Sequence, residues 1–312
     1  MALVDPAITR DAVARQLRGQ RADVSGVLFR ILLMAALAIT VSVLVVLLWD
    51  VWSGGWPVFR ERAGSFINGT LSSRAHRAGV FQGIRGSFWI AVFTVTLAFP
   101  LGIGAAIYLE EYAPRSRFAR IVDLNIRNLA GVPSVVYGIL GLAIFVKALE
   151  RVTGGRTVMA AGITLAILVL PLVIITSAEA IRAVPDSLRE AGFGVGATRW
   201  EVIRHHVLPY AAPGILTGTV LSLARALGEA APLILVGATT DFLGGGKGQL
   251  FDLSQLTERF TALPIVITTW AGRPQQDFRA LTAAAIVVLL LIVLLFNSAA
   301  ILLRNRYEKK RR

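Results

Sequence analysis

The feature that most constrains this chain is a series of six long apolar stretches, each of at least 18 residues without Asp, Glu, Lys or Arg. The hydrocarbon core of a bilayer is about 30 Å thick and needs roughly 20 helical residues to cross it. A helix suits that core because it satisfies its own backbone hydrogen bonds. We therefore predict an all-α integral membrane protein with six transmembrane helices. Their expected cores are residues 31–48, 86–109, 128–146, 157–178, 207–224 and 280–303.

Composition supports the same class of protein. Hydrophobic residues make up 55% of the chain and charged residues only 16%, whereas a soluble domain is about 25% charged. The absence of Cys excludes disulfides and thiolate metal sites. The net charge of +13 is also typical of nucleic-acid binding, but in a membrane protein an excess of Lys and Arg marks cytoplasmic ends. We therefore expect no nucleic-acid partner.

The distribution of Lys and Arg predicts the orientation of the chain. Eighteen of them fall in the two tails and in the loops after the second and fourth stretches, against eleven in the opposite loops. The richer side is expected to be cytoplasmic. Both termini then lie in the cytoplasm, and the basic carboxyl-terminal tail is expected to bind anionic membrane lipid.

Four segments are expected along the chain. Residues 1–26 form a cytoplasmic tail, 27–68 contain the first transmembrane helix and an external loop, 69–303 form the transmembrane domain, and 304–312 form the basic tail. The first apolar stretch starts too late and is too long for a cleaved signal peptide. A shorter apolar stretch at 260–272 cannot cross a bilayer and is expected to lie in the membrane interface or to re-enter.

The loop after the fourth stretch carries two helix-start signatures with a glycine between them. Ser187 stands three residues before Glu190, and Thr198 stands three before Glu201. Ser or Thr followed three residues later by Glu is the capping-box pattern. Gly196 separates the two signatures, and glycine commonly ends a helix and allows a sharp turn. The sequence thus predicts two short helices that meet at a glycine corner and project from the membrane.

This loop, residues 185–209, is expected to display apolar side chains on its surface. Clustered apolar side chains on a surface often mark a protein interface. We therefore predict a partner that covers the loop, and an ordinary solvated loop with well-capped helices is the alternative. The apolar residues concerned are Leu188, Ala191, Val195 and Trp200.

The same loop resembles the EAA loop of ABC-importer permeases, whose pattern is Glu-Ala-Ala, three residues, Gly, nine residues, Ile, one residue, Leu-Pro. Here Glu190 opens the pattern and Pro209 closes it, with Gly192 in place of an Ala and His206 in place of the Ile. The resemblance implies the type I ABC-importer permease fold and a coupling helix that docks on a cytoplasmic ATPase subunit. By position, the ATPase-coupling residues would be Ser187, Leu188, Glu190, Ala191, Gly192, Gly196, Thr198, Trp200 and Glu201.

Three further segments resemble the phosphate-uptake permeases of the PstA/PstC family, and the third is closer to the PstA type. They are residues 100–114, 129–138 and 224–233, and the resemblance covers about residues 69–303. It implies a bacterial inner-membrane complex. This chain would pair with a homologous PstC-like permease subunit, with an ATPase dimer (PstB-like) inside and a phosphate-binding protein (PstS-like) outside.

The fifth stretch is expected to continue past Arg225 and Glu229 to Ala238. Residues four apart share one face of a helix, and charge inside a span is costly unless it is paired or faces water. Arg225 is thus interpreted as a substrate-pathway residue that helps phosphate across, with Glu229 as its counter-charge. The alternative is an ion pair that only locks helix packing. Glu179 is a third pathway candidate, and its other interpretation is a helix-end pair with Arg182.

No ATP site is visible in the sequence. The glycine-rich segment 244–248 fails the P-loop pattern twice, at Asp241 and at Gly248. We therefore expect no cofactor and no enzymatic activity in this chain, with ATP and Mg²⁺ bound by the partner ATPase. The alternatives left open are a permease for sulfate or molybdate, a PstC-like half, a membrane scaffold or sensor, and a self-sufficient secondary transporter or channel.

Overall fold

The structure is a computed structural model that describes residues 24–113, 116–240 and 256–309. The regular secondary structure of these residues is entirely helical. The chain divides into two units, residues 1–51 and 52–312. By length and composition, five of the described helices can cross a membrane, and a sixth crossing exists if one bent helix pair counts as a single span. The prediction of an all-helical membrane protein is therefore confirmed.

Helix α2 (Val24–Asn68) starts in the first unit and ends in the second. The helix is long and apolar enough to cross a membrane. The later part of the 27–68 segment, expected to be external, is helical and continues α2 across a kink at Arg62. The cause lies in the second unit, where Val58 and Phe66 are buried in an apolar cluster and hold this segment in place.

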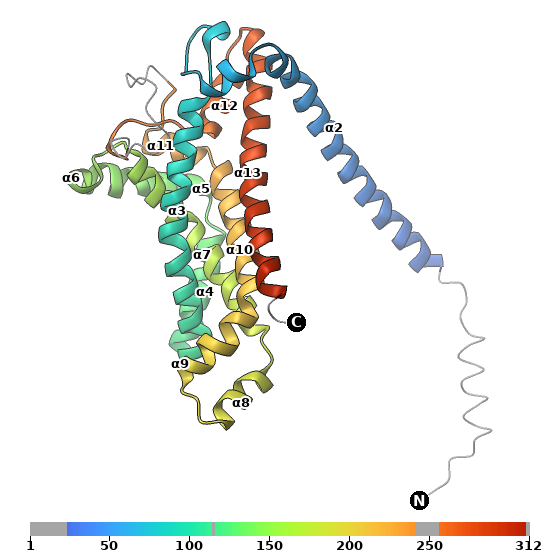
Figure 1. The fold of residues 1–312 in the computed structure, drawn as a ribbon, viewed down its shortest axis with the longest axis vertical. Coiled ribbons are helices and arrows are strands. Elements are labelled where there is room, and N and C mark those ends of the chain that lie inside the picture. The colour runs from blue at the N-terminus through green and yellow to red at the C-terminus, as the bar shows by residue number, and fades with distance from the viewer. Residues whose placement is uncertain (1–23, 114–115, 241–255, 310–312) are drawn as a thin grey trace, which may run out of the picture. The chain divides into compact units, whose positions relative to one another are not determined.

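Four long helices of the second unit pack into a bundle (Figure 1). Helix α7 packs against α3 and α10, and α10 also packs against α13. Small residues allow close approach, since a Cβ at Gly102 of α3 would lie 2.6 Å from Val173 Cγ1 of α7. The helices are α3 (Phe81–Ile107), α7 (Val158–Arg182), α10 (Leu208–Gly228) and α13 (Asp277–Lys309).

The third predicted span is broken rather than continuous. Helix α4 (Arg117–Ala130) and the following helical segment Ser134–Ala148 meet at an angle of 97°. Pro133 stands at the break with φ −55° and ψ 137°. Proline disfavours helical conformation in the residue before it. The third predicted span, 128–146, is therefore part of a bent helix pair, which gives the sixth crossing if the pair counts as one span.

The structure corrects the extent of the fifth span and shows how the short apolar stretch packs. Helix α10 ends at Gly228 and a separate helix, α11 (Ala231–Val236), follows, so the fifth span does not run on to Ala238. The apolar stretch 260–272 forms α12 (Leu263–Ala271), which packs against α3 and α13. Trp270 is buried, so this stretch packs against its neighbouring helices, and its location in the membrane interface or as a re-entrant segment stays a prediction.

The remaining elements are short and connect the bundle helices. Three are π-helical turns, in which the backbone bond spans five residues. They are η1 (Ala75–Arg77), η2 (Tyr108–Tyr112), α5 (Ser134–Gly141), η3 (Leu142–Ala148), α6 (Glu150–Thr153), α8 (Asp186–Gly194), α9 (Arg199–Val202) and η4 (Ile203–Val207), of which η2, η3 and η4 are the π-helical ones.

Candidate functional site

The 185–209 loop forms two helices, α8 and α9, beyond the end of the bundle that lies opposite α12 (Figure 1). The predicted glycine corner is present. Gly196 has φ +83°, a conformation that costs other residues roughly 1–2 kcal/mol. Its N–H donates to the carbonyl of Phe193 at 2.9 Å. Nothing lies within 4 Å of a Cβ placed there, so backbone conformation alone requires the glycine.

The second predicted capping box is confirmed. The Thr198 hydroxyl accepts from the Glu201 N–H at 3.4 Å, and the Glu201 carboxylate accepts from the Thr198 N–H at 2.7 Å. This box starts α9, which continues through η4 directly into α10. The second loop helix is therefore the beginning of the fifth membrane helix rather than an independent short helix.

The first predicted capping box is wrong. Helix α8 begins at Asp186, after Pro185, and no side chain caps it. Ser187 therefore lies inside the first turn. The Asp186 carboxylate instead accepts a hydrogen bond from Arg189 Nη1 at 3.1 Å.

The loop surface is largely as predicted, with two differences. Ala191, Val195 and Trp200 are exposed, as is Glu190. Leu188 is only partly exposed, because it packs against the apolar cluster formed by α3, α7, α9 and α10. Phe193 is exposed and was missed, although it lies between predicted surface residues. The exposed apolar side chains extend the candidate docking surface along α8.

Gly192 allows α8 and α9 to touch. A Cβ at this buried glycine would lie 2.8 Å from Val202 Cγ2, closer than the 3.5–4.0 Å of ordinary carbon contacts. The departure from the EAA pattern at this position is thus explained by packing between the two loop helices.

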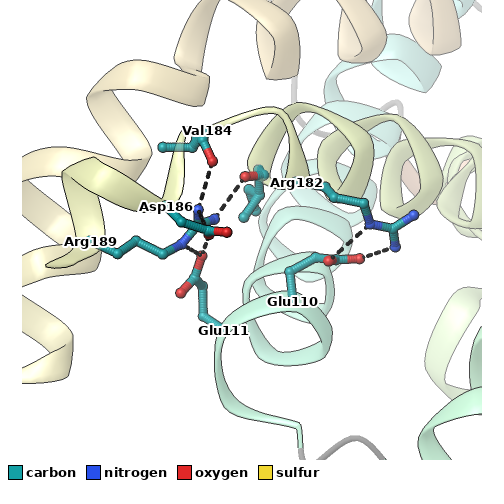
Figure 2. Close-up of polar contacts among 7 residues, drawn as sticks. Glu110, Glu111, Arg182, Val184, Asp186 and Arg189 are labelled. Carbon is teal, nitrogen blue, oxygen red and sulfur yellow. Dashed lines mark hydrogen bonds and ion pairs between the residues drawn. The ribbon is translucent and has the colours of Figure 1, made fainter. Parts of the chain in front are cut away.

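Sequence reasoning missed a group of contacts that holds the loop to the bundle (Figure 2). Arg182, at the end of α7, forms a two-pronged ion pair with Glu110 of η2. The expected pair between Arg182 and Glu179 is therefore wrong. Arg189 of α8 forms an ion pair with Glu111 of η2 at 2.9 Å. The sequence signal for these contacts was the pair of adjacent carboxylates, Glu110 and Glu111, at the end of the second apolar stretch.

Arg225 and Glu229 form the expected ion pair, with 3.4 Å between Nε and Oε1. They do not share a helix face, because α10 ends at Gly228 and Glu229 is extended, with φ −79° and ψ 117°. The Arg225 side chain is 48% exposed and that of Glu229 only 19%. The pair joins the end of α10 to its own cap and links no two helices, which argues against a packing lock.

Glu179 is exposed on α7. Within the part of the chain that the structure describes, it forms no ion pair with Arg225, so the predicted pathway residues are not brought into one cluster. No group of three or more His, Asp or Glu side chains among the described residues could hold a metal ion. The segment 244–248 lies outside the described residues.

The apolar helical bundle with a two-helix loop at one end is similar in fold to the membrane subunits of solved ABC importers. A solved bacterial ABC transporter involved in the import of the acidic polysaccharide alginate matches with a TM-score of 0.59 at 17% identity, over 88% of this chain and 97% of that chain. The MetNI methionine ABC transporter in inward-facing conformations matches with a TM-score of 0.53 at 18% identity, over 73% and 94%. These likenesses show the fold, that of type I ABC-importer permeases.

The chain belongs to the family of binding-protein-dependent transport system inner membrane components, whose model matches residues 98–310. The probable ABC transporter permease protein YqgH of Bacillus subtilis is 38% identical over 53% of this chain and 54% of its own length. The phosphate transport system permease protein PstA 1 of Mycobacterium tuberculosis is 35% identical over 74% and 73%. The chain thus spans about half the length of the first of these relatives.

Proposed function

We propose that this chain is a permease subunit of an ATP-driven phosphate importer in the bacterial inner membrane. The proposal is carried by the Arg225 guanidinium, which is half exposed and, among the described residues, hydrogen bonded to Glu229 alone. Its remaining N–H donors are available to an anion. Arginine binds phosphate oxygens strongly because its planar fork matches their geometry and carries charge.

The adjacent Glu229 favours phosphate over sulfate. Phosphate near neutral pH keeps a protonated oxygen, which donates a hydrogen bond, whereas sulfate only accepts. An ionised carboxylate only accepts as well, so it can bind the phosphate hydroxyl but repels sulfate. The similarity to PstA permeases supports the same substrate.

Transport is driven through the 185–209 loop. The exposed side chains of Phe193, Val195 and Trp200 supply an apolar surface for an ATPase subunit, and apolar patches that a partner covers are typical of such interfaces. On this proposal the loop faces the cytoplasm, and both chain termini lie on the same side. ATP and Mg²⁺ bind to the ATPase dimer, and this chain contributes no catalytic residue.

The transport pathway requires two further proteins. A homologous PstC-like permease subunit lies beside this chain and completes the pathway, and an external PstS-like binding protein delivers phosphate. The exposed positions of Arg225 and Glu179 are consistent with side chains that face such a shared pathway. Selectivity for sulfate or molybdate in the assembled complex would instead support the alternative oxyanion permease.

The experiment is phosphate uptake by vesicles that contain the assembled complex with Arg225→Gln. Loss of a charged hydrogen bond to phosphate is expected to lower uptake about 10- to 100-fold, with normal co-purification of the ATPase. Arg127→Gln is the matched control, because Arg127 also pairs with a carboxylate four residues away and its side chain is 39% exposed. Unchanged uptake with Arg225→Gln, or equal loss in both variants, contradicts the assigned role.

A further inference from the structure

The π-helical turn η2 presents three consecutive side chains, and each is held by a different arginine. Glu110 binds Arg182 of α7, and Glu111 binds Arg189 of α8. The third contact places the Arg199 guanidinium of α9 5.2 Å from the centre of the Tyr112 ring. One turn at the end of α3 thus contacts, in chain order, the last bundle helix before the loop and both loop helices.

Arg189 donates more hydrogen bonds than either of the other two arginines (Figure 2). Its Nε and Nη2 both donate to Glu111 Oε1, at 3.1 and 2.9 Å. Its Nη2 also donates to the carbonyl of Ile181 at 3.0 Å, and its Nη1 to that of Val184 at 2.7 Å and to Asp186 at 3.1 Å. One side chain therefore joins α8, the end of α7 and the end of α3.

The Glu111–Arg189 pair is more deeply buried than the neighbouring Glu110–Arg182 pair. The Glu111 and Arg189 side chains are 9% and 18% exposed, whereas Arg182 in the adjacent pair is 56% exposed. Exposed ion pairs contribute little because water screens them. A buried pair is different, since removal of one partner leaves an uncompensated charge. The pair formed by Glu111 and Arg189 is thus the rigid connection, and the one formed by Glu110 and Arg182 is the weak one.

The π-helical geometry of η2 makes these contacts possible. The N–H of Ala113 donates to the carbonyl of Tyr108 at 2.8 Å, five residues earlier, which adds one residue to the last turn of α3. The wider turn changes the direction in which the following side chains project.

We infer that the Glu111–Arg189 pair is a transmission latch, which couples displacement of α8 to movement of α3. Without it, α8 keeps its backbone connection to α7 and its apolar packing through Leu188 and Gly192, but it loses its ion pair with the end of α3. This inference rests on the proposed function, because displacement of α8 is the work of the ATPase. Glu111 and Arg189 are positioning residues and contact no substrate.

The first test compares Glu111→Gln with Glu110→Gln in the assembled complex, with phosphate uptake and ATP hydrolysis measured together. Glu111→Gln keeps the shape of the side chain and removes its charge. It is expected to lower phosphate taken up per ATP hydrolysed about tenfold, within the usual range of coupling between sites, while ATP hydrolysis and assembly stay near the wild type. Glu110→Gln is expected to retain the wild-type ratio.

An unchanged ratio in Glu111→Gln overturns the latch. If Glu111→Gln does not assemble, Glu111→Asp decides, because it keeps the charge but shortens the reach. Assembly with a lowered ratio supports the latch, and either a normal ratio or a second failure to assemble overturns it. A wild-type complex that takes up no phosphate contradicts the proposed function instead.

A second readout does not depend on the substrate. Hydrogen exchange of the α8 amides in the purified full-length protein is expected to be about tenfold faster in Glu111→Gln, since local opening reports local stability. It is expected to stay at the wild-type rate in Glu110→Gln. Equal exchange in both variants overturns the latch even where the transport substrate is not phosphate.

Discussion

The contact between α8 and α9 makes a sharp prediction for Gly192→Ala, the substitution that would restore the Ala of the EAA pattern. On helix propensity alone, alanine gains about 1 kcal/mol over glycine. The new Cβ, however, would lie 2.8 Å from Val202 Cγ2 and 3.4 Å from Val202 Cγ1. Val202 is buried and its branched side chain is stiff, so α9 must shift.

The matched variant is Gly194→Ala in the same helix, where a Cβ meets nothing within 4 Å. Overpacking costs typically about 1–3 kcal/mol, which exceeds the propensity gain at Gly192 and is absent at Gly194. The two variants should therefore differ by about 2 kcal/mol, or roughly 30-fold in the local opening constant of α8.

Hydrogen exchange of the α8 amides measures this difference. Gly192→Ala should lower protection and Gly194→Ala should retain or raise it. In the double variant Gly192→Ala/Val202→Ala, the two effects should not add, because the second change removes the clashing methyl groups. Equal protection in the two single variants, or higher protection in Gly192→Ala, would refute the reasoning.

Three further predictions concern single side chains. Thr198→Val removes the cap of α9 and should reduce the stability of the loop by about 1 kcal/mol, seen as faster exchange of the Glu201 amide; unchanged exchange contradicts the cap. Gly196→Ala should cost roughly 1–2 kcal/mol from the left-handed backbone alone, seen as weaker binding of the ATPase, and wild-type affinity would contradict this. Glu229→Gln should lower the preference for phosphate over sulfate about tenfold, measured by competitive uptake, whereas unchanged selectivity removes Glu229 from anion recognition.

Features fixed by neighbouring residues were predictable from sequence. The Gly196 corner and the Thr198 capping box depend on residues within three positions, so a local pattern is enough to place them. The apolar stretches likewise predicted the long helices, because every backbone group must be satisfied within the segment in lipid. The first capping box failed because Pro185 and Asp186 start α8 one residue before Ser187.

Features fixed by packing between distant segments were not predictable. Arg182 pairs with Glu110, which is 72 residues earlier in the chain, rather than with the nearby Glu179. Charge spacing alone cannot distinguish these partners. The same holds for Glu111 and Arg189, 78 residues apart, whose pairing requires the ends of α3 and α7 to lie together.

The most direct test of the central claim is phosphate uptake by vesicles that contain this chain with its homologous subunit and the external binding protein, measured with and without the ATPase. The account predicts uptake that requires the ATPase and ATP, and that is lost when Trp200→Asp introduces charge into the exposed apolar surface of the loop. Phosphate uptake at the same rate without the ATPase would contradict it, because the loop would then not couple ATP hydrolysis to transport.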